Sequence, residues 1–324
     1  MTCSRIVAAL AAMALSLATS AAAQGLPAYV PINPATTSRS ALYFQPYEAP
    51  APGWRATVQF EWSSMIEYKG AAPGIPEAWL FDAEMLRLDV TLVRDYGSGN
   101  FLLVSAGAAS VVDGVMDEFF DWYHDLVGLP GGGRTVRPTN EFAYEATLPG
   151  NRSFTWGKPG LMLTDVKLGI GVRNTPSIQT LVFATLPTTT HQRGYGRGTV
   201  SANGIVTARS QLSERLYYEG SVGMGWTPRQ GDMEAFQKTL FWSASSGLRF
   251  RFWGRQAMFF NAFYQTGSYR DSGLKPIDRA ELTGDMGFLL RTGRNAPELI
   301  LALTEDLLPT GPAVDATFRI GLRW

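Results

Sequence analysis

The sequence predicts an all-β protein: a transmembrane, antiparallel, up-and-down β-barrel of about twelve strands, with one short helix in its longest external loop. Three observations predict this fold. Apolar and polar residues alternate in many segments, the last of these segments ends on Trp324, and short and long connections alternate along the chain. Mean hydropathy is −0.03, which fits a barrel because only every second residue of each strand meets lipid.

The first residues have the features of a secretory signal peptide. Arg5 gives a basic start, residues 6–18 form an apolar run too short to span a bilayer as a helix, and residues 21–23 offer a small-residue cleavage site. We therefore predict a cleaved signal peptide over 1–23, with an uncleaved membrane anchor as the alternative. Cys3 is the single cysteine, so the mature chain would form neither a disulfide nor a thiolate metal site.

Residues 24–53 are rich in proline and small side chains. We predict that they form a periplasmic N-terminal tail, which could lie partly inside the barrel. Residues 41–47 could add a short strand. The barrel domain is then expected to cover residues 54–324.

The C-terminal segment, 315–324, alternates without interruption. The apolar residues Phe318, Ile320, Leu322 and Trp324 would share one face of a strand, because successive side chains of a strand point to opposite sides. This end resembles the C-terminal signal by which outer-membrane barrels are recognised and inserted. It predicts that the protein reaches the cell outer membrane of a Gram-negative bacterium, with the assembly machinery and outer-membrane lipid as partners.

Similar alternation predicts the other strands. They are expected at 54–68, 86–93, 101–110, 163–173, 177–186, 199–210, 216–226, 239–252, 257–266, 281–291 and 298–304. The facing of 177–186 is ambiguous. Short turns alternate with long loops between these strands, as in barrels with short periplasmic turns and long external loops. The alternative is a soluble barrel or a two-sheet sandwich, whose apolar rows would face inward.

One helix is predicted in the longest external loop, over 113–127. Met116, Phe119, Phe120, Tyr123, Leu126 and Val127 recur at helical spacing, Asp113 can cap the start, and Gly128 with Pro130 can end the helix. The segment could fold into the lumen as a plug or could pack on its own apolar stripe outside. The residues singled out for this role are Asp113, Phe119, Trp122, Tyr123, His124 and Arg134. A hairpin is expected over 141–156.

The polar face of the strands predicts a charged lumen. The candidates are Arg55, Arg87, Asp89, Lys167, Arg173, Glu219, Arg249, Arg251, Asp285, Arg291, Arg319 and Arg323, with Glu61 beside them. Several of the arginines fall near periplasmic strand ends. They could form a basic mouth that favours anionic solutes, or they could form interior salt bridges that fill a narrow barrel, which is the interpretation we favour.

Composition and motifs argue against other classes of function. Lys and Arg together number 28, as do Asp and Glu, so no basic excess points to nucleic acid. His124 and His191 have no metal spacing, and no phosphate loop or nucleophile elbow is present. We expect no metal and no cofactor. Some outer-membrane barrels are lipid hydrolases, and His124 near Asp121 or Asp125 is the one candidate base; we expect that the protein is not an enzyme.

Scattered motifs resemble an uncharacterised family of proteobacterial outer-membrane proteins, the family of domain of unknown function 3187. They are Phe81-Asp82-Ala83-Glu84, Asp113, Trp122-Tyr123-His124, Gly128-Leu129-Pro130, Arg134, Thr164-Asp165-Val166, Leu186-Pro187-Thr188 and Glu305-Asp306-Leu307. Two features depart from its pattern: Thr189 replaces a glycine, and a Pro-Asp pair is split into Pro312 and Asp315. The resemblance implies a barrel fold and an outer-membrane location, and it implies no substrate.

The function expected from these observations is a channel or porin-like barrel for small solutes, with a lumen that could be plugged. The alternatives are a structural or partner-binding barrel without transport and, third, a barrel lipid hydrolase. The sequence does not identify the solute.

Overall fold

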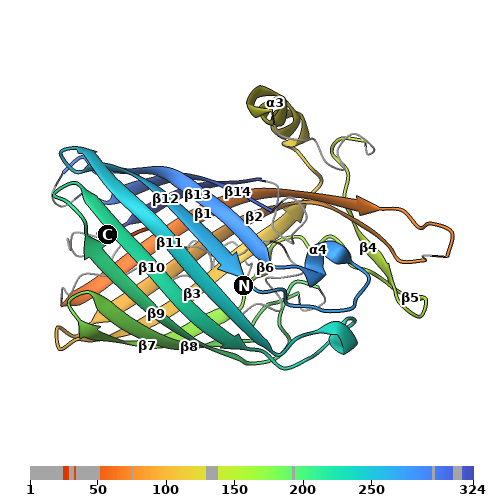
Figure 1. Cartoon of the computed structure of the whole chain (residues 1–324), viewed down its shortest axis with the longest axis horizontal. Helices are drawn as coiled ribbons and strands as arrows, with labels where there is room; N and C mark the ends of the chain where they lie inside the picture. Colours follow the sequence, from red (N-terminus) through yellow and green to blue (C-terminus); the bar gives the residue numbers. More distant parts are fainter. Residues whose placement is uncertain are drawn as a thin grey trace.

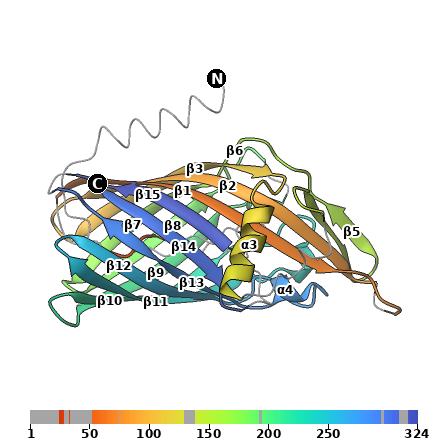
Figure 2. The same ribbon diagram turned by 90° about the horizontal axis from the view of Figure 1, so that it is seen from above.

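Twelve strands close into one antiparallel barrel in the structure, a computed structural model that describes residues 25–28, 33, 52–74, 76–128, 138–191, 194–293, 296–308 and 316–324. Each barrel strand pairs with the next one along the chain, and β1 (Gly53–Lys69) pairs with β15 (Ala316–Arg323) to close the ring. Figures 1 and 2 show the barrel from two sides. The predicted fold is confirmed, including the number of strands. The predicted signal peptide and Arg134 lie outside the described residues.

The other barrel strands follow the predicted segments closely. They are β2 (Ala78–Asp95), β3 (Asn100–Val112), β7 (Val166–Thr175), β8 (Ile178–Leu186), β9 (Ser201–Gln211), β10 (Leu216–Trp226), β11 (Leu240–Trp253), β12 (Gln256–Gln265), β13 (Glu281–Leu290) and β14 (Glu298–Asp306). The short connections lie at the end that holds Trp324, and the long connections lie at the other end. We call these the periplasmic and external ends.

Side chains on the two faces of each strand differ as the alternation predicts. On β11, Trp242 is 59% exposed on the outer wall, whereas Arg249 is buried in the lumen. On β8, whose facing was ambiguous, Val182 is 59% exposed and its neighbours Leu181 and Phe183 are buried. The ambiguity has a physical cause: the lumen beside β8 is lined by apolar side chains, so both faces of this strand are apolar.

The sheet extends beyond the barrel at the external end (Figure 1). There β2 pairs with β4 (Ala143–Leu148), and β4 pairs with β5 (Arg152–Thr155), which together form the predicted hairpin. The ring of Tyr144 stacks on Phe81 and on Trp156, with 4.6 Å between centroids in each case. These rings belong to a buried apolar cluster at the external end, which β6 (Met162–Leu163), η2 (Glu234–Phe236) and α4 (Lys275–Asp278) complete.

The predicted helix is α3 (Asp117–Val127), and Gly128 ends it in the left-handed conformation, with φ of 73°. Glycine suits this position because it lacks the Cβ that makes positive φ costly. Among the described residues, no helix is long and apolar enough to cross a membrane.

Candidate functional site

The lumen is the candidate site, because most of the predicted charged residues meet there and are buried. A belt of ion pairs runs around one half of the wall at mid-barrel. Arg319 contacts Asp285 at 2.5 Å and lies 4.0 Å from Glu61, while Arg87 contacts Asp89 at 2.5 Å. We call these five residues the mid-barrel belt. They lie on β13, β15, β1 and β2, with all five side chains buried.

The wall beside the belt is shaped to fit it. Thr304 on β14 donates a hydrogen bond to Asp285 at 2.9 Å. Gly107 on β3 faces Asp89, and a Cβ at position 107 would lie 2.7 Å from the Asp89 carboxylate and 2.4 Å from the Leu88 carbonyl oxygen. The missing side chain therefore leaves the space that the Asp89 carboxylate occupies.

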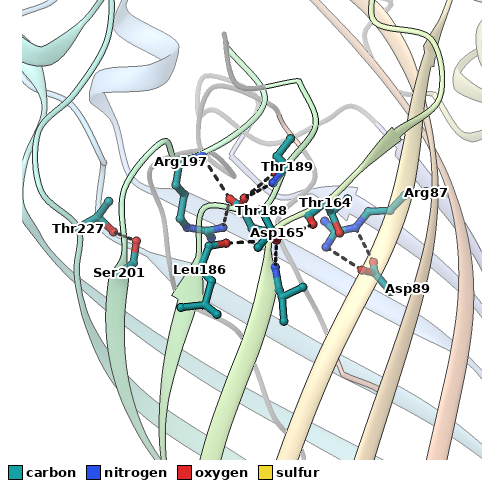
Figure 3. Close-up of polar contacts among 11 residues, drawn as sticks. Arg87, Asp89, Thr164, Asp165, Leu186, Thr188, Thr189, Arg197, Ser201 and Thr227 are labelled. Carbon is teal, nitrogen blue, oxygen red and sulfur yellow. Dashed lines mark hydrogen bonds and ion pairs between the residues drawn. The ribbon is translucent and has the colours of Figure 1, made fainter. Parts of the chain in front are cut away.

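A small polar pocket lies on the external side of the belt (Figure 3). Its centre is Asp165, which accepts hydrogen bonds from Thr189 Oγ1 at 2.6 Å and from Arg197 Nη1 at 3.2 Å. Arg87 and Lys167 line the same cavity, whose volume is about 40 Å³. Since a water molecule needs roughly 10–15 Å³ measured in this way, the cavity has room for water or a few solute atoms.

Acidic residues also pair with the periplasmic arginines. Asp95 at the end of β2 contacts both Arg55 and Arg173. Glu298 on β14 contacts Arg323 and lies 4.0 Å from Arg249. The charges at this mouth are therefore arranged as ion pairs and do not form a ring of one sign.

The N-terminal segment Gly25–Ala28 lies inside the lumen and joins two distant walls. The backbone N–H of Leu26 donates to Glu219 Oε2 on β10 at 3.1 Å. On β15, Arg323 donates to the carbonyl oxygens of Leu26 at 3.3 Å and Gly25 at 2.8 Å, and Arg319 donates to that of Ala28 at 2.8 Å. Because β10 and β15 are five strands apart in a ring of twelve, the segment crosses the lumen.

Leu26 fills an apolar socket in the wall. Its side chain is fully buried with Phe259, Phe263, Leu289 and Ile300. The wall makes room for it at Gly247 on β11, where an added Cβ would lie 2.5 Å from Leu26 Cδ1. Peptide and wall are therefore complementary in shape as well as in hydrogen bonding.

Two of the predicted lumen arginines lie at turns. Arg251, near the end of β11, is partly exposed and donates to the carbonyl oxygen of Glu214 at 2.7 Å. Arg291 follows β13, and its backbone exchanges hydrogen bonds with the side chain of Gln256. Neither contact belongs to the mid-barrel belt.

The structure corrects one interpretation of the loop helix: α3 does not fold into the lumen. Phe119 and Phe120 contact the ring of Phe318 on the outer wall, at 5.5 and 5.8 Å between centroids. The apolar stripe of the helix packs on the outer wall of the barrel. Burial, together with the neighbouring Glu305, raises the pKa of Tyr123 to about 12.

The other residues singled out in this loop that the structure describes also lie outside the lumen. The backbone N–H of Met116 donates to Glu84 Oε1 at 2.7 Å, and Trp62 Nε1 donates to Glu84 Oε2 at 2.7 Å. Asp113 forms an ion pair with Lys158. Trp122 is 57% exposed, and His124 is buried under the helix. Among the described residues, no group of His, Cys, Asp or Glu could hold a metal ion.

The residues of the predicted insertion signal lie on the outer face of β15. Ile320 is 55% exposed, and Phe318, Leu322 and Trp324 are partly exposed. Trp324 lies at the barrel seam, where its backbone N–H donates to the carbonyl oxygen of Ala56 at 2.9 Å.

Sequence reasoning missed several residues of the site. Asp95 lies beyond the predicted strand 86–93, and Arg197 lies in a loop, where alternation carries no signal. Asp165 and Glu298 fell within the predicted strands 163–173 and 298–304, but they were not singled out as lumen charges. Leu26 belongs to a proline-rich and small-residue segment without periodicity. In the predicted lumen, arginines outnumber acidic residues. Because buried charges are normally paired, this excess was the one signal that further acidic partners were needed.

Solved structures match this chain at low sequence identity. The chain is similar to the COG4313 outer membrane channel from Pseudomonas putida F1, with 12% identity, a TM-score of 0.52, and coverage of 85% of this chain and 94% of that one. It also matches the Pseudomonas putida toluene transporter TodX at 10% identity and a TM-score of 0.40, covering 90% of each chain. The NanC porin matches at 7% identity and a TM-score of 0.45, covering 83% of this chain and 98% of that one.

Among curated proteins, none matches the chain significantly. The model of the family described as "Protein of unknown function (DUF3187)" matches residues 4–324. This match covers nearly the whole sequence, and the fold is that of an outer-membrane β-barrel. The chain therefore belongs to the DUF3187 family of proteins of unknown function.

Proposed function

We propose that this protein is an outer-membrane channel for small solutes, and that the N-terminal segment Gly25–Ala28 closes its lumen. The observation that carries the proposal is the set of hydrogen bonds by which Glu219, Arg319 and Arg323 hold the backbone of that segment across the barrel. A barrel whose only role was structural would have no need of a separate peptide that bridges opposite walls.

The two arginines that bind the segment remain paired with acidic residues of the wall when the segment leaves. Arg319 has Asp285 as its partner, and Arg323 has Glu298, whether or not the peptide is present. The peptide contributes neutral carbonyl oxygens, which water can replace in an open pore. Withdrawal of residues 25–28 therefore leaves both Arg319 and Arg323 with an acidic partner, and the open state is electrostatically accessible.

The charges at mid-barrel favour weak ion preference. The mid-barrel belt has three acids (Glu61, Asp89 and Asp285) and two arginines, and nearby Lys167 makes three cations, so the net charge is zero. Selective pores carry rings of one sign. We therefore expect an open pore that discriminates by size more than by charge, rather than an anion-selective one.

Planar-bilayer recording tests the proposal. Leu26→Asp places a carboxylate in an apolar socket beside Glu219, so the segment should leave the lumen and the current should rise above that of the wild-type protein. Leu161→Asp makes the same change at a residue that is 50% exposed in an external loop and should leave the current unchanged. If the folded Leu26→Asp barrel passes no more current than the wild type, the channel proposal is wrong.

A partner-binding barrel without transport is the second candidate, favoured by the external extension of the sheet. A groove of about 390 Å³ lies there, lined by Tyr68, Lys69, Glu145, Thr147 and Ser153 among others. Liposome swelling separates the two candidates, because a partner-binding barrel would stay impermeable even with Leu26→Asp. A lipid hydrolase is a weaker candidate, since the burial of His124 argues against a role as an accessible base.

A further inference from the structure

The helix α3 presents three different sides. One side is buried against the barrel and includes Asp117, Phe120 and His124. A second side is acidic, with Glu118 and Asp125 exposed and Asp121 partly exposed. The third side is apolar and exposed; together with Val115 just before the helix, it consists of Val115 (68% exposed), Phe119 (36%), Trp122 (57%) and Leu126 (66%). We call these four residues the apolar ridge.

The strand register fixes the height of the helix on the outer wall. Glu84 and Glu305 lie in the same row of paired residues as Ala316, since Glu305 pairs with Ala316 and Ser64 pairs with both Ala316 and Glu84. Phe318 lies one outward-facing row nearer the bilayer centre. Met116 contacts Glu84, and Tyr123 contacts Glu305, whereas Phe119 reaches down to Phe318.

The apolar ridge is therefore continuous with the lipid-facing wall. Phe119 is a member of the ridge, and Phe318 shares a face with Ile320, which is 55% exposed on the outer wall. Figure 2 shows that α3 lies across the barrel wall, transverse to the long axis of the barrel. A helix in this orientation at the external rim lies parallel to the membrane plane.

We propose that α3 is an interfacial helix whose apolar ridge enters the hydrocarbon edge of the external leaflet. Such helices lie in the membrane surface with one apolar side immersed and a charged side in water, and tryptophan favours this depth. The occupant of the ridge is lipid, because the ridge consists of apolar side chains and borders the lipid-facing row. The barrel thereby gains a lateral membrane contact beyond its strands.

Site-directed spin labelling tests this proposal. Because Cys3 is the single cysteine, the full chain with Cys3→Ser accepts one label at a time. Labels are placed at Trp122→Cys and Leu126→Cys on the ridge, and at Glu118→Cys and Asp125→Cys on the acidic side of the same helix. The proteins are reconstituted in phosphatidylcholine bilayers, and collision with oxygen is compared with collision with a water-soluble nickel chelate. Heat-modifiable gel migration verifies that each variant is folded.

We expect the two ridge labels to shift toward oxygen and away from nickel, and the two acidic-side labels to do the opposite. Equal nickel access at all four positions would show that the ridge lies in water and would overturn the proposal. Ridge labels that are immobilised and shielded from both reagents would show a protein partner on the ridge and would overturn it as well.

Discussion

Leu26 and Glu219 are 193 residues apart in the chain, and the backbone N–H of Leu26 donates to Glu219 Oε2 at 3.1 Å inside the lumen. Glu219 also lies 3.7 Å from Arg209, so one carboxylate serves both the wall and the peptide. The bond to Leu26 is charge-assisted, which makes it stronger than a hydrogen bond between neutral groups. The strength of this hydrogen bond therefore contributes directly to the free energy that holds the segment in the lumen.

Glu219→Gln should loosen the N-terminal segment without removing the acceptor oxygen. A neutral acceptor replaces a charged one, so we expect a loss of about 1 kcal/mol, which is roughly a fivefold change in the closed-to-open ratio. Faster hydrogen exchange of the Leu26 amide would report it. Glu145→Gln, at an exposed position on β4, is the control, and equal exchange rates in the two variants would contradict the prediction.

Gly247→Ala should expel the Leu26 side chain from its socket, because the new Cβ would lie 2.5 Å from Leu26 Cδ1. The expected result is a higher planar-bilayer current and easier proteolysis of the N-terminal segment. Gly204→Ala on β9 is the matched control, since no heavy atom lies within 4 Å of a Cβ at that position. The prediction is refuted if the two alanine variants behave alike.

Asp285→Asn should destabilise the barrel by removing the partner of Arg319 from the mid-barrel belt. Loss of one member of a buried ion pair costs about 3–5 kcal/mol, and Glu61 lies 4.0 Å from Arg319, too far to replace Asp285 fully. Thr304→Val removes only the hydrogen bond to Asp285 and should cost about 1 kcal/mol. The urea concentration at the unfolding midpoint would be compared for the two variants and the wild type. An Asp285→Asn barrel as stable as the wild type would show that this ion pair does not contribute to stability.

Phe120→Asp should detach α3 from the wall and leave the conductance unchanged. Phe120 is fully buried against Phe318, so a carboxylate there cannot keep its place, yet the helix lies outside the lumen. Limited proteolysis near the helix reports detachment. A rise in current on detachment would instead mean that the helix blocks the pore.

The barrel was predictable from the sequence because lipid and lumen impose a period of two on every strand, as in the alternation that ends at Trp324. The position of α3 was not, since an amphipathic pattern predicts a buried side and does not say which surface buries it. Phe318 forms part of that surface, and it was predicted correctly to face outward on β15.

The candidate site was predictable only in part, and the reason is geometric. Arg249 and Glu298 meet although they lie on β11 and β14, three strands apart in the barrel. Contacts across a lumen depend on the shear and curvature of the whole ring, which local alternation does not encode. The same holds for Leu26, whose socket is assembled from β11, β12, β13 and β14.

A reversible lock between the N-terminal segment and the wall tests the central claim most directly. In the full chain with Cys3→Ser, the pair Leu26→Cys and Gly247→Cys places two thiols at the observed contact. The account predicts that the disulfide forms, that the oxidised barrel carries little current, and that the current rises when a reductant is added. A pair that never crosslinks, or a current that is the same before and after reduction, would contradict it.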